Sequence, residues 1–298
     1  MSDPFQSSIL HTPAAIVVMG NEHAYQDLCI FLDTLQLWNE DLPPIYCFCT
    51  TRLQTKLQTE MQRYKGIIYY RQDLELYVAL NRATMEQMPS QQGLSNFFHD
   101  FTIEKCELMK WALESIPESD KERGVLFCDA DIAWFGPLVK IPKGKTLALS
   151  QHMIRKRDEA KYGEFNAGLL WTNQSTMPDK WKEASKRSRF FEQAALEELA
   201  DMTLDKHLYR FDETVNYGWW RMFQSDTPIA MKQREWAFQS NTTSSSGICV
   251  NGKPLVCIHT HFKTDDYTTH MFNTFVKQFL ARGKGSILET MQTILTSH

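Results

Sequence analysis

The first 70 residues alternate between short apolar runs and longer segments in which apolar residues recur at helical spacing. The apolar runs predict strands at 14–20, 43–50 and 66–70, and the segments between them, 21–38 and 52–63, predict helices. Strands that alternate with helices in this way are typical of a parallel sheet with helices packed against it. The pattern therefore predicts an α/β fold with a central, mostly parallel sheet flanked by helices.

The rest of the chain continues the alternation with less regular spacing. A helix is predicted at 101–116, where a proline ends it, and a longer one at 178–200, with proline at its start. A last helix is expected at 270–283. Further strands are predicted at 125–129, 146–150, 167–172 and 254–259. Because no repeat or linker divides the chain, we expect one domain over 1–298, with a tail at 1–13.

Two carboxylates follow the apolar run 125–128 directly. Asp129 and Asp131 are two residues apart, so on an extended segment both side chains point to the same side. Ligands in open α/β sheets bind beyond the carboxyl ends of strands, and a divalent cation would relieve the repulsion between the two acids. Mg²⁺ and Mn²⁺ both accept carboxylate oxygens. A surface turn or a pair of helix caps is the alternative interpretation of this motif.

Two histidines lie at the end of the predicted strand 254–259 and just beyond it, in the segment CIHTHFK. Either His259 or His261 would add an imidazole ligand to the two carboxylates, which favours Mn²⁺ over Mg²⁺. Lys263 would hold a phosphate as a point charge. A structural role for one histidine after a strand is the alternative, and the sequence does not choose between the two rings.

Two further segments carry candidate catalytic groups. In GEFNAGLLWTN, Asn166 offers a donor and an acceptor to hydroxyls, while the small residues Ala167 and Gly168 allow a backbone to approach a ligand closely. In YRFDETVNYGWW, Asp212 and Glu213 open an apparent helix. One of the two acids is expected to cap that helix or to act as a general base.

Composition and charge exclude several classes of protein. The chain has 298 residues and a net charge of −4, without a long basic block, which argues against nucleic acid as a partner. The amino terminus lacks the features of a secretory signal, and no apolar run is long enough for a transmembrane helix. Most of the seven cysteines lie in apolar runs, as expected for reduced thiols in a cytoplasmic protein.

The motifs above, in their order along the chain, resemble the signature of GT-A glycosyltransferases of the nucleotide-diphospho-sugar transferase group. That signature reads roughly DxDxxW…P, then FNAG, then D-[QE]-x-x-N, then a histidine after a late strand. The matching residues here are Asp129, Asp131, Trp134, Pro137, Phe165–Gly168, Asp212, Glu213, Asn216 and His259. The resemblance spans residues 14 to 275, and it implies a Rossmann-like GT-A fold.

The resemblance also implies where a nucleotide-sugar would bind. Val18, Met19 and Asn21 at the opening strand would contact base and ribose, and Lys105 would lie near the phosphates. Asp129, Ala130, Asp131, Ala167, Gly168 and Lys263 complete the implied donor site. By this resemblance, residues 14–135 are expected to be the nucleotide-binding half and residues 136–298 the acceptor-binding half.

The implied reaction is transfer of a sugar from a nucleotide diphosphate to a hydroxyl of a glycan or glycoconjugate. Mn²⁺, or alternatively Mg²⁺, would be held by the two aspartates and a late histidine, and UDP-xylose, UDP-galactose or UDP-glucose would be the donor. In an inverting enzyme Asp212 or Glu213 would be the base, and in a retaining one Asn166 or a backbone group would stabilise the front face. This chain departs from the family after His259, where HTHFKTDD replaces the usual glycine and Lys-Pro pair.

Two alternative functions fit parts of the sequence. A haloacid-dehalogenase-type phosphatase also has an apolar strand that ends in DxD, and KTDD at 263–266 imitates its later acidic pair. A catalytically inactive transferase fold would serve as a nucleotide- or sugar-binding module. An aromatic cluster suggests a carbohydrate acceptor, although a large aromatic core explains such residues equally; it comprises Tyr217, Trp219, Trp220 and Trp236.

Overall fold

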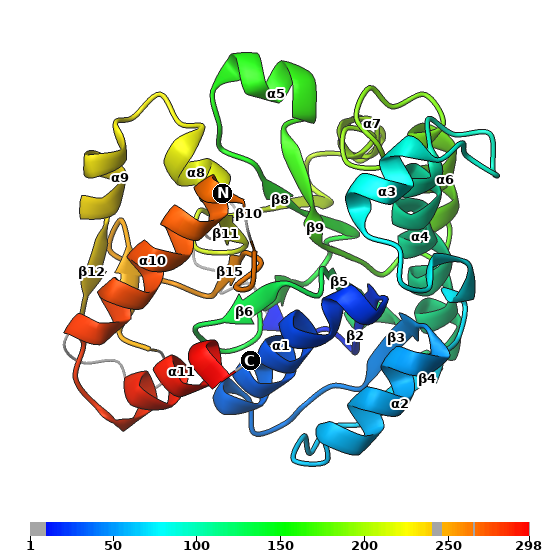
Figure 1. The fold of residues 1–298 in the computed structure, drawn as a ribbon. Helices are drawn as coiled ribbons and strands as arrows, with labels where there is room; N and C mark the ends of the chain where they lie inside the picture. The colour runs from blue at the N-terminus through cyan, green and yellow to red at the C-terminus, as the bar shows by residue number, and fades with distance from the viewer. Residues whose placement is uncertain (1–9, 240–245, 265, 298) are drawn as a thin grey trace, which may run out of the picture.

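A seven-stranded, mostly parallel sheet forms the centre of the structure, a computed structural model that describes residues 10–239, 246–264 and 266–297 (Figure 1). The strand order is β10-β8-β9-β5-β2-β3-β4; β9 runs antiparallel to both its neighbours, and the other neighbours run parallel. These strands are β2 (Ala15–Gly20), β3 (Ile45–Cys49), β4 (Ile68–Arg71), β5 (Val125–Cys128), β8 (Leu147–Gln151), β9 (Phe165–Thr172) and β10 (Leu208–Phe211). The predicted α/β class is confirmed.

Helices cover both faces of this sheet, which explains why its strands read as unbroken apolar runs. Alternate residues of β2 enter two different cores: Val17 packs on one face of the sheet, and Ile16 and Val18 pack on the other. The first face is covered by α4 (Phe97–Ser115), α6 (Met177–Ser185) and α7 (Leu196–Met202), and the second by α1 (Tyr25–Trp38) and α2 (Thr51–Glu60).

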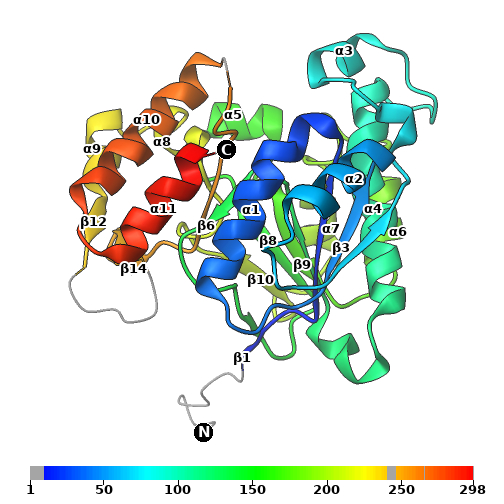
Figure 2. The ribbon, with the colours of Figure 1, turned by 60° about the horizontal axis from the view of Figure 1, so that its bottom comes forward.

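A small second sheet lies beside the central one, next to the C-terminal helices (Figures 1 and 2). β6 (Ile132–Trp134) follows β5 and pairs with β15 (Cys257–His259), which also pairs with β11 (Tyr217–Gly218). A third core joins this sheet to α8 (Trp219–Phe223), α10 (Tyr267–Arg282), α11 (Ser286–Ser297) and the β12-β13-β14 sheet (Trp236–Phe238, Ile248–Val250, Lys253–Pro254).

The remaining elements are short and lie around these layers. They are β1 (Leu10–His11), β7 (Ile141–Pro142), α3 (Arg82–Gln87), α5 (Lys156–Tyr162), α9 (Ile229–Arg234) and the 3-10 helices at Glu22–Ala24, Glu75–Tyr77 and Glu118–Arg123. Of the expected tail at 1–13, the structure describes residues 10–13, and Leu10–His11 form the strand β1, which pairs with β7. Residues 1–9 lie outside the described ranges.

The single long helix predicted at 178–200 is wrong. The chain forms α6 and α7 with an irregular segment between them, in which Phe191 has a left-handed backbone (φ 43°). Trp181 Nε1 donates to the carbonyl of Glu192 at 2.8 Å, and the Glu192 carboxylate accepts from Lys105 Nζ at 2.8 Å. These tertiary contacts outweigh the helical periodicity of the local sequence.

The helix expected to open at Asp212 is also wrong. Residues 212–216 form a turn between β10 and β11, where the Asp212 carboxylate accepts from the backbone N–H of Thr214 at 2.9 Å. Asn216 closes the turn with a left-handed backbone (φ 58°), a conformation that Asn tolerates better than most residues. The predicted strand 254–259 is divided into β14 and β15, and β15 belongs to the small sheet.

Across the described ranges, no helix combines the length and the apolar character needed to cross a membrane. All seven cysteines are free thiols with buried side chains, which agrees with the apolar runs in which most of them lie.

Candidate functional site

The two aspartates of the DxD motif lie in the turn that joins β5 to β6, at the carboxyl end of β5. The backbone N–H of Asp129 donates to the carbonyl of Gly168 in β9 at 2.7 Å, which ties the turn to the central sheet. On the other side, the N–H of Thr260 donates to the carbonyl of Asp131 at 3.0 Å. Because β15 pairs with β6, His259 lies beside a motif that is distant in sequence.

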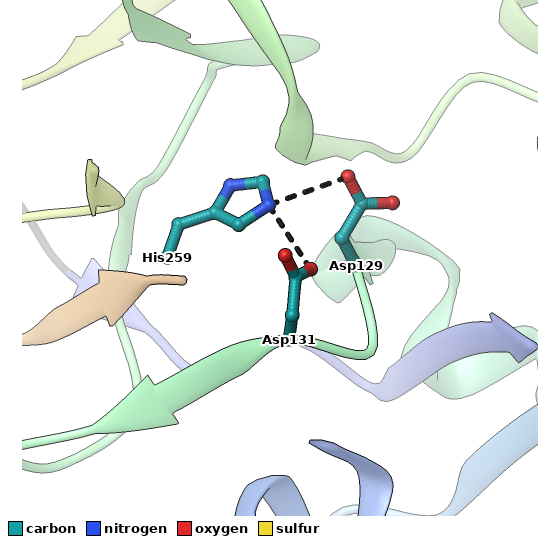
Figure 3. Close-up of side chains that lie close together, drawn as sticks. All are labelled: Asp129, Asp131 and His259. Atoms are coloured by element: carbon teal, nitrogen blue, oxygen red, sulfur yellow. Dashed lines mark ion pairs between the residues drawn. The ribbon is translucent and has the colours of Figure 1, made fainter. Parts of the chain in front are cut away.

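The side chains of Asp129, Asp131 and His259 converge on one point (Figure 3). His259 Nε2 lies 3.0 Å from Asp131 Oδ1 and 3.7 Å from Asp129 Oδ2. One ligand atom from each residue lies within 4.8 Å of the other two. The side chains of Asp131 and His259 are each 10% exposed and that of Asp129 is 26% exposed, while Ala130 between the aspartates is buried. The structure thus groups His259, rather than His261, with both aspartates.

Asn216 fixes the orientation and the tautomer of His259. Its amide nitrogen donates to Ser150 Oγ at 3.0 Å and to Asn166 Oδ1 at 2.9 Å, so its Oδ1 is an acceptor and faces His259 Nδ1 at 2.9 Å. The imidazole therefore donates through Nδ1–H. Its Nε2 then points at the two carboxylates, as in metal sites whose histidine is held by a second hydrogen bond.

Lys105 is buried behind the motif and joins two acids. Its Nζ lies 3.1 Å from Asp129 Oδ1 and 2.8 Å from Glu192 Oε1. Burial alone would lower the pKa of Lys105, but the two carboxylates raise it above its usual value. Burial would likewise raise the pKa of Glu192, which the Lys105 ammonium holds below its usual range. Burial raises the pKa of Asp129 despite Lys105. Lys105 is thus a charged, fully engaged side chain.

The donors present fit a divalent cation. The carboxylates of Asp129 and Glu192 share one ammonium, that of Lys105, and His259 directs Nε2 at Asp129 and Asp131. The two acids around Lys105 carry one more negative charge than the ammonium neutralises, which is costly in a buried site. A cation bound by Asp129, Asp131 and the His259 imidazole would compensate this charge.

His261 contacts Oδ2 of Asp131, whereas His259 contacts Oδ1 of the same carboxylate. Its Nε2 is 3.3 Å from Asp131 Oδ2, and its Nδ1 is 2.8 Å from Asp27 Oδ2. The Asp131 carboxylate, with a contribution from Asp27, raises the pKa of His261 to about 10, and partial desolvation of the ring by its neighbours opposes this shift. Burial would raise the pKa of Asp131, but His259 and His261 hold it below its usual value. Lys263, two residues on, is exposed.

Asn166 is buried and fully engaged with the protein. Its amide nitrogen faces His152 Nε2 at 3.2 Å and Gln193 Oε1 at 3.1 Å. Its oxygen accepts from the N–H of Gly168 and the amide of Asn216, both at 2.9 Å. All the hydrogen-bonding capacity of this amide is therefore used, so Asn166 acts here as a link between β9 and the turn that holds His259.

The small residue at Gly168 makes room for a side chain, and the predicted close approach of a ligand to Ala167 and Gly168 stays a prediction. A Cβ added at Gly168 would lie 2.2 Å from Cε1 and 2.5 Å from Nδ1 of His259, so the missing side chain makes room for the imidazole. Ala167 is buried, and its carbonyl lies 3.5 Å from Lys105 Nζ. The register of β8 and β9 shifts at this level, which is typical of strands beside functional sites.

Asp212 and Glu213 are not brought together with the three candidate ligands in the part of the chain that the structure describes. Lys253 Nζ lies 3.2 Å from Glu213 Oε2 and 3.7 Å from Asp212 Oδ2. Lys253 belongs to β14, which precedes β15, whereas His259 is the last residue of β15. The general-base role of either acid stays a prediction.

The three residues expected to contact a nucleotide have buried side chains. Val18 and Met19 pack in the two cores on either side of β2. Asn21 donates to the carbonyls of Tyr77 and Leu80 at 2.8 and 2.7 Å, which anchors the segment after β4 to the end of β2. Nucleotide binding at this strand end stays a prediction, and a ligand there would meet backbone groups.

The aromatic cluster noted in the sequence is mostly core. Tyr217, Trp220 and Trp236 are buried, and Trp220 packs edge-on against the His259 ring at 5.1 Å between centroids. Trp219 is partly buried on the third core. The interpretation as a large aromatic core therefore holds for three of the four residues, and Trp220 serves the site by packing against His259.

Sequence reasoning missed several residues of the site. Asp27 is one acid in an amphipathic helix, and Glu192 and Gln193 lie inside a segment that reads as continuous helix, so no local signal marks them. His152 lacks a motif as well. Arg221 carried a usable signal, because it is a single charge within the apolar run WWRMF; it is buried and donates to the carbonyls of Glu213 and Gln151, each at 2.6 Å.

Comparison with known proteins identifies structures but not sequences that are similar to this chain. No family model matches the sequence, and no curated protein matches it. Two structures of the glycosyltransferase GlyE from Streptococcus pneumoniae TIGR4 match with TM-scores of 0.51 and 0.50 at 14% and 13% identity. Each match covers 96% of this chain and 64% of the GlyE chain, so this chain spans less than two thirds of GlyE.

A structure of the galactosyltransferase LgtC, in complex with donor and acceptor sugar analogs, also matches, with a TM-score of 0.44 and 13% identity over 93% of this chain and 99% of LgtC. The similarity to GlyE shows the fold: this chain has the α/β architecture of GT-A glycosyltransferases that its motifs implied.

Proposed function

We propose that this protein is a metal-dependent glycosyltransferase that uses a nucleotide-diphosphate sugar as donor and a hydroxyl of a glycan or glycoconjugate as acceptor. The observation that carries the proposal is the convergence of Asp129, Asp131 and His259, from two distant segments, at the carboxyl end of β5. The GT-A architecture supports it, because ligands in open α/β sheets bind at this edge.

In this proposal Asp129, Asp131 and His259 hold Mn²⁺, with Mg²⁺ as the alternative. A cation there would stabilise the negative charge of the departing nucleotide diphosphate. The imidazole in the ligand set favours Mn²⁺. The protein's own contribution is to keep the ligands in place: Lys105 engages Asp129, and Asn216 holds the His259 ring with Nε2 directed at the aspartates.

In the transfer step the acceptor oxygen forms a bond to the anomeric carbon, the bond from that carbon to the diphosphate oxygen breaks, and the acceptor loses its proton. If the enzyme inverts, we propose Asp212 or Glu213 as the base, which requires release from Lys253. If it retains, Asn166 would act on the front face by positioning β9 and the His259 turn. UDP-xylose, UDP-galactose and UDP-glucose are the proposed donors.

We further propose that residues 14–135 bind the nucleotide and residues 136–298 bind the acceptor within one domain. Backbone groups around Val18, Met19 and Asn21 would meet the nucleoside, and Lys263, which is exposed beyond β15, would meet a phosphate. The seven free, buried thiols support a reducing compartment such as the cytoplasm.

A thermal-shift panel tests the metal and the donor together. Wild type and Asp131→Asn would be heated with UDP, GDP, CMP and their sugars, each with Mn²⁺ and with EDTA. A ligand at 100 times its Kd stabilises the fold by about 2.7 kcal/mol, so a clear shift is expected for one nucleotide, with Mn²⁺ only, and not in the variant. Asp33→Asn is the matched control, because Asp33, on α1, pairs with Arg63 instead of facing the candidate site.

Turnover assays separate the alternatives. Release of UDP from a UDP-sugar that requires Mn²⁺ and Asp131 supports the transferase, whereas Mn²⁺-dependent UDP binding without any turnover supports the binding module. Hydrolysis of p-nitrophenyl phosphate that is lost in Asp129→Asn would contradict the proposal in favour of the phosphatase. Of the acidic pair that suggested a phosphatase, Asp266 caps α10 by accepting from Thr269, and residue 265 lies outside the described ranges.

A further inference from the structure

Asp27 is a buried carboxylate on α1 that faces the metal centre through one histidine. Its side chain is 9% exposed, and its Oδ2 lies 2.8 Å from Nδ1 of His261. The other nitrogen of that ring, Nε2, lies 3.3 Å from Oδ2 of Asp131. Asp27, His261 and Asp131 therefore form one line of contacts that ends at a candidate metal ligand.

The two oxygens of Asp131 are held by different histidines. Oδ1 lies 3.0 Å from Nε2 of His259, on the side that also faces Asp129. Oδ2 faces His261. Each imidazole is held through its Nδ1 by a buried side chain, Asn216 for His259 and Asp27 for His261. The arrangement fixes the rotation of the Asp131 carboxylate, and hence the oxygen that is available to a cation.

A contribution to folding alone does not explain a carboxylate at this position. Asp27 Oδ1 is buried without a side-chain hydrogen-bond partner within the described part of the chain, which disfavours the folded state. An uncharged side chain would avoid that penalty. Asp33, on the same helix and 10% exposed, instead has both oxygens bonded by the Arg63 guanidinium. Groups that orient metal ligands are commonly retained at such a cost.

We propose that Asp27 is a positioning residue of the metal centre: through His261 it holds Oδ2 of Asp131, so that Oδ1 faces the cation. This inference rests on the proposed function, since it requires a divalent cation at Asp129, Asp131 and His259. It assigns His261 to the support of Asp131 and leaves His259 as the imidazole ligand. His261 suits this role because its ring is 63% exposed at the edge of the site, outside the group of three converging ligands.

Direct titration of Mn²⁺ by calorimetry, without nucleotide, tests the proposal on the full chain. Asp27→Leu removes the acceptor for His261 Nδ1–H, and we expect Mn²⁺ affinity to fall 10- to 100-fold, which is typical when a group that orients a ligand is lost. Asp27→Asn retains an acceptor oxygen and is expected to keep most of the affinity. Asp33→Leu, the matched loss of an α1 carboxylate, should leave Mn²⁺ binding unchanged.

A double-mutant cycle shows whether the effect passes through His261. His261→Ala should weaken Mn²⁺ binding by a similar factor. Adding Asp27→Leu to it should cause little further loss of affinity, because His261→Ala already removes the side chain through which Asp27 acts. His261 is exposed, so this variant keeps the test available even if Asp27→Leu does not fold. The electron paramagnetic resonance spectrum of bound Mn²⁺ should change in both variants and not in Asp33→Leu.

The outcomes separate this proposal from the proposed function. Wild-type protein that does not bind Mn²⁺ would overturn the metal centre itself, and the role of Asp27 with it. Wild-type binding that is equally strong in Asp27→Leu or in His261→Ala would overturn only the inference about Asp27. Independent, additive losses in the cycle would also overturn it, because Asp27 would then act by a route other than His261.

Discussion

A single methyl group added at Gly168 should disable the proposed metal centre. The Cβ of Gly168→Ala would lie 2.2 Å from Cε1 and 2.5 Å from Nδ1 of His259, distances at which one of the two groups has to move. The His259 ring has little room to do so. Its Nδ1 is held by Asn216 at 2.9 Å, and Trp220 packs edge-on against it. The expected response is a rotated imidazole whose Nε2 no longer faces the aspartates.

The size of the effect follows from two opposing contributions. Overpacking a rigid site costs about 1–3 kcal/mol. The backbone of Gly168 lies outside the left-handed region, so alanine restricts the unfolded chain and returns about 0.4–1 kcal/mol. We therefore expect a net loss of about 1–2 kcal/mol of unfolding free energy, or a few degrees in Tm. Mn²⁺ affinity should fall far more, because the ligand is displaced.

The assay is a double-mutant cycle with His259→Ala, read by urea unfolding and by Mn²⁺ titration. His259→Ala removes the ring that would lie closest to the new methyl group, so Gly168→Ala should cost much less in that background, where the contact with Asn166 Oδ1 at 2.8 Å remains. A coupling energy of about 1 kcal/mol or more between the two sites is then expected. The Mn²⁺ affinity of the double variant should equal that of His259→Ala alone.

Two results would refute this reasoning. If Gly168→Ala binds Mn²⁺ as tightly as the wild type, His259 either is not a ligand or does not occupy the space beside Gly168. If the stability losses of the two substitutions simply add, the methyl group meets something other than the imidazole.

Two further predictions concern buried charges near the site. Lys105→Met leaves Asp129 and Glu192 without their shared cation and should destabilise the fold by about 3–5 kcal/mol. Adding Glu192→Leu to Lys105→Met should recover part of this stability. Urea unfolding at pH 7 measures both variants, and additive losses of stability would contradict the pairing. Burial lowers the pKa of His152 to about 4, so the unfolded chain binds a proton that the folded chain excludes between pH 6.5 and 4. The contribution of His152 to the free energy of unfolding is fully present above pH 6.5 and should fall by about 3 kcal/mol as the pH drops toward 4. His152→Gln should remove this part of the pH dependence of stability, and an unchanged pH dependence would contradict the prediction.

The central sheet and the DxD motif could be predicted because their signals are local. Each strand of a sheet covered on both faces is a short apolar run, and β2, β3 and β5 begin and end within two residues of the predicted positions. Asp129 and Asp131 follow such a run, so their place at a strand end follows from the pattern alone. The order of the motifs, rather than any one of them, then indicated the GT-A fold, which the similarity to GlyE confirms.

The supports of the ligands could not be predicted, because they depend on contacts between distant segments. Glu192 lies in a stretch whose periodicity favours helix, and only its pairing with Lys105 and the Trp181 bond to its carbonyl show why the helix stops. Asp27 is an ordinary acid in the first turn of a helix until β15 brings His261 to it. The helix predicted to begin at Asp212 was wrong for the opposite reason, because here the local signal is strong. An Asp at this position is typical of a helix start, but in the structure its carboxylate stabilises a turn.

These supports make the two halves of the chain interdependent. The aspartates and Lys105 precede residue 135, whereas Glu192, Asn216, His259 and His261 all follow it. The turn that carries the aspartates is itself held from the second half, by Gly168 on one side and Thr260 on the other. Because each proposed ligand takes its orientation from a group in another segment, the proposed metal centre can form only after β9 and β15 have docked on β5 and β6. The proposed division into a nucleotide-binding and an acceptor-binding half is therefore one of function within a single folded unit. The proposed cation site takes its residues from both halves.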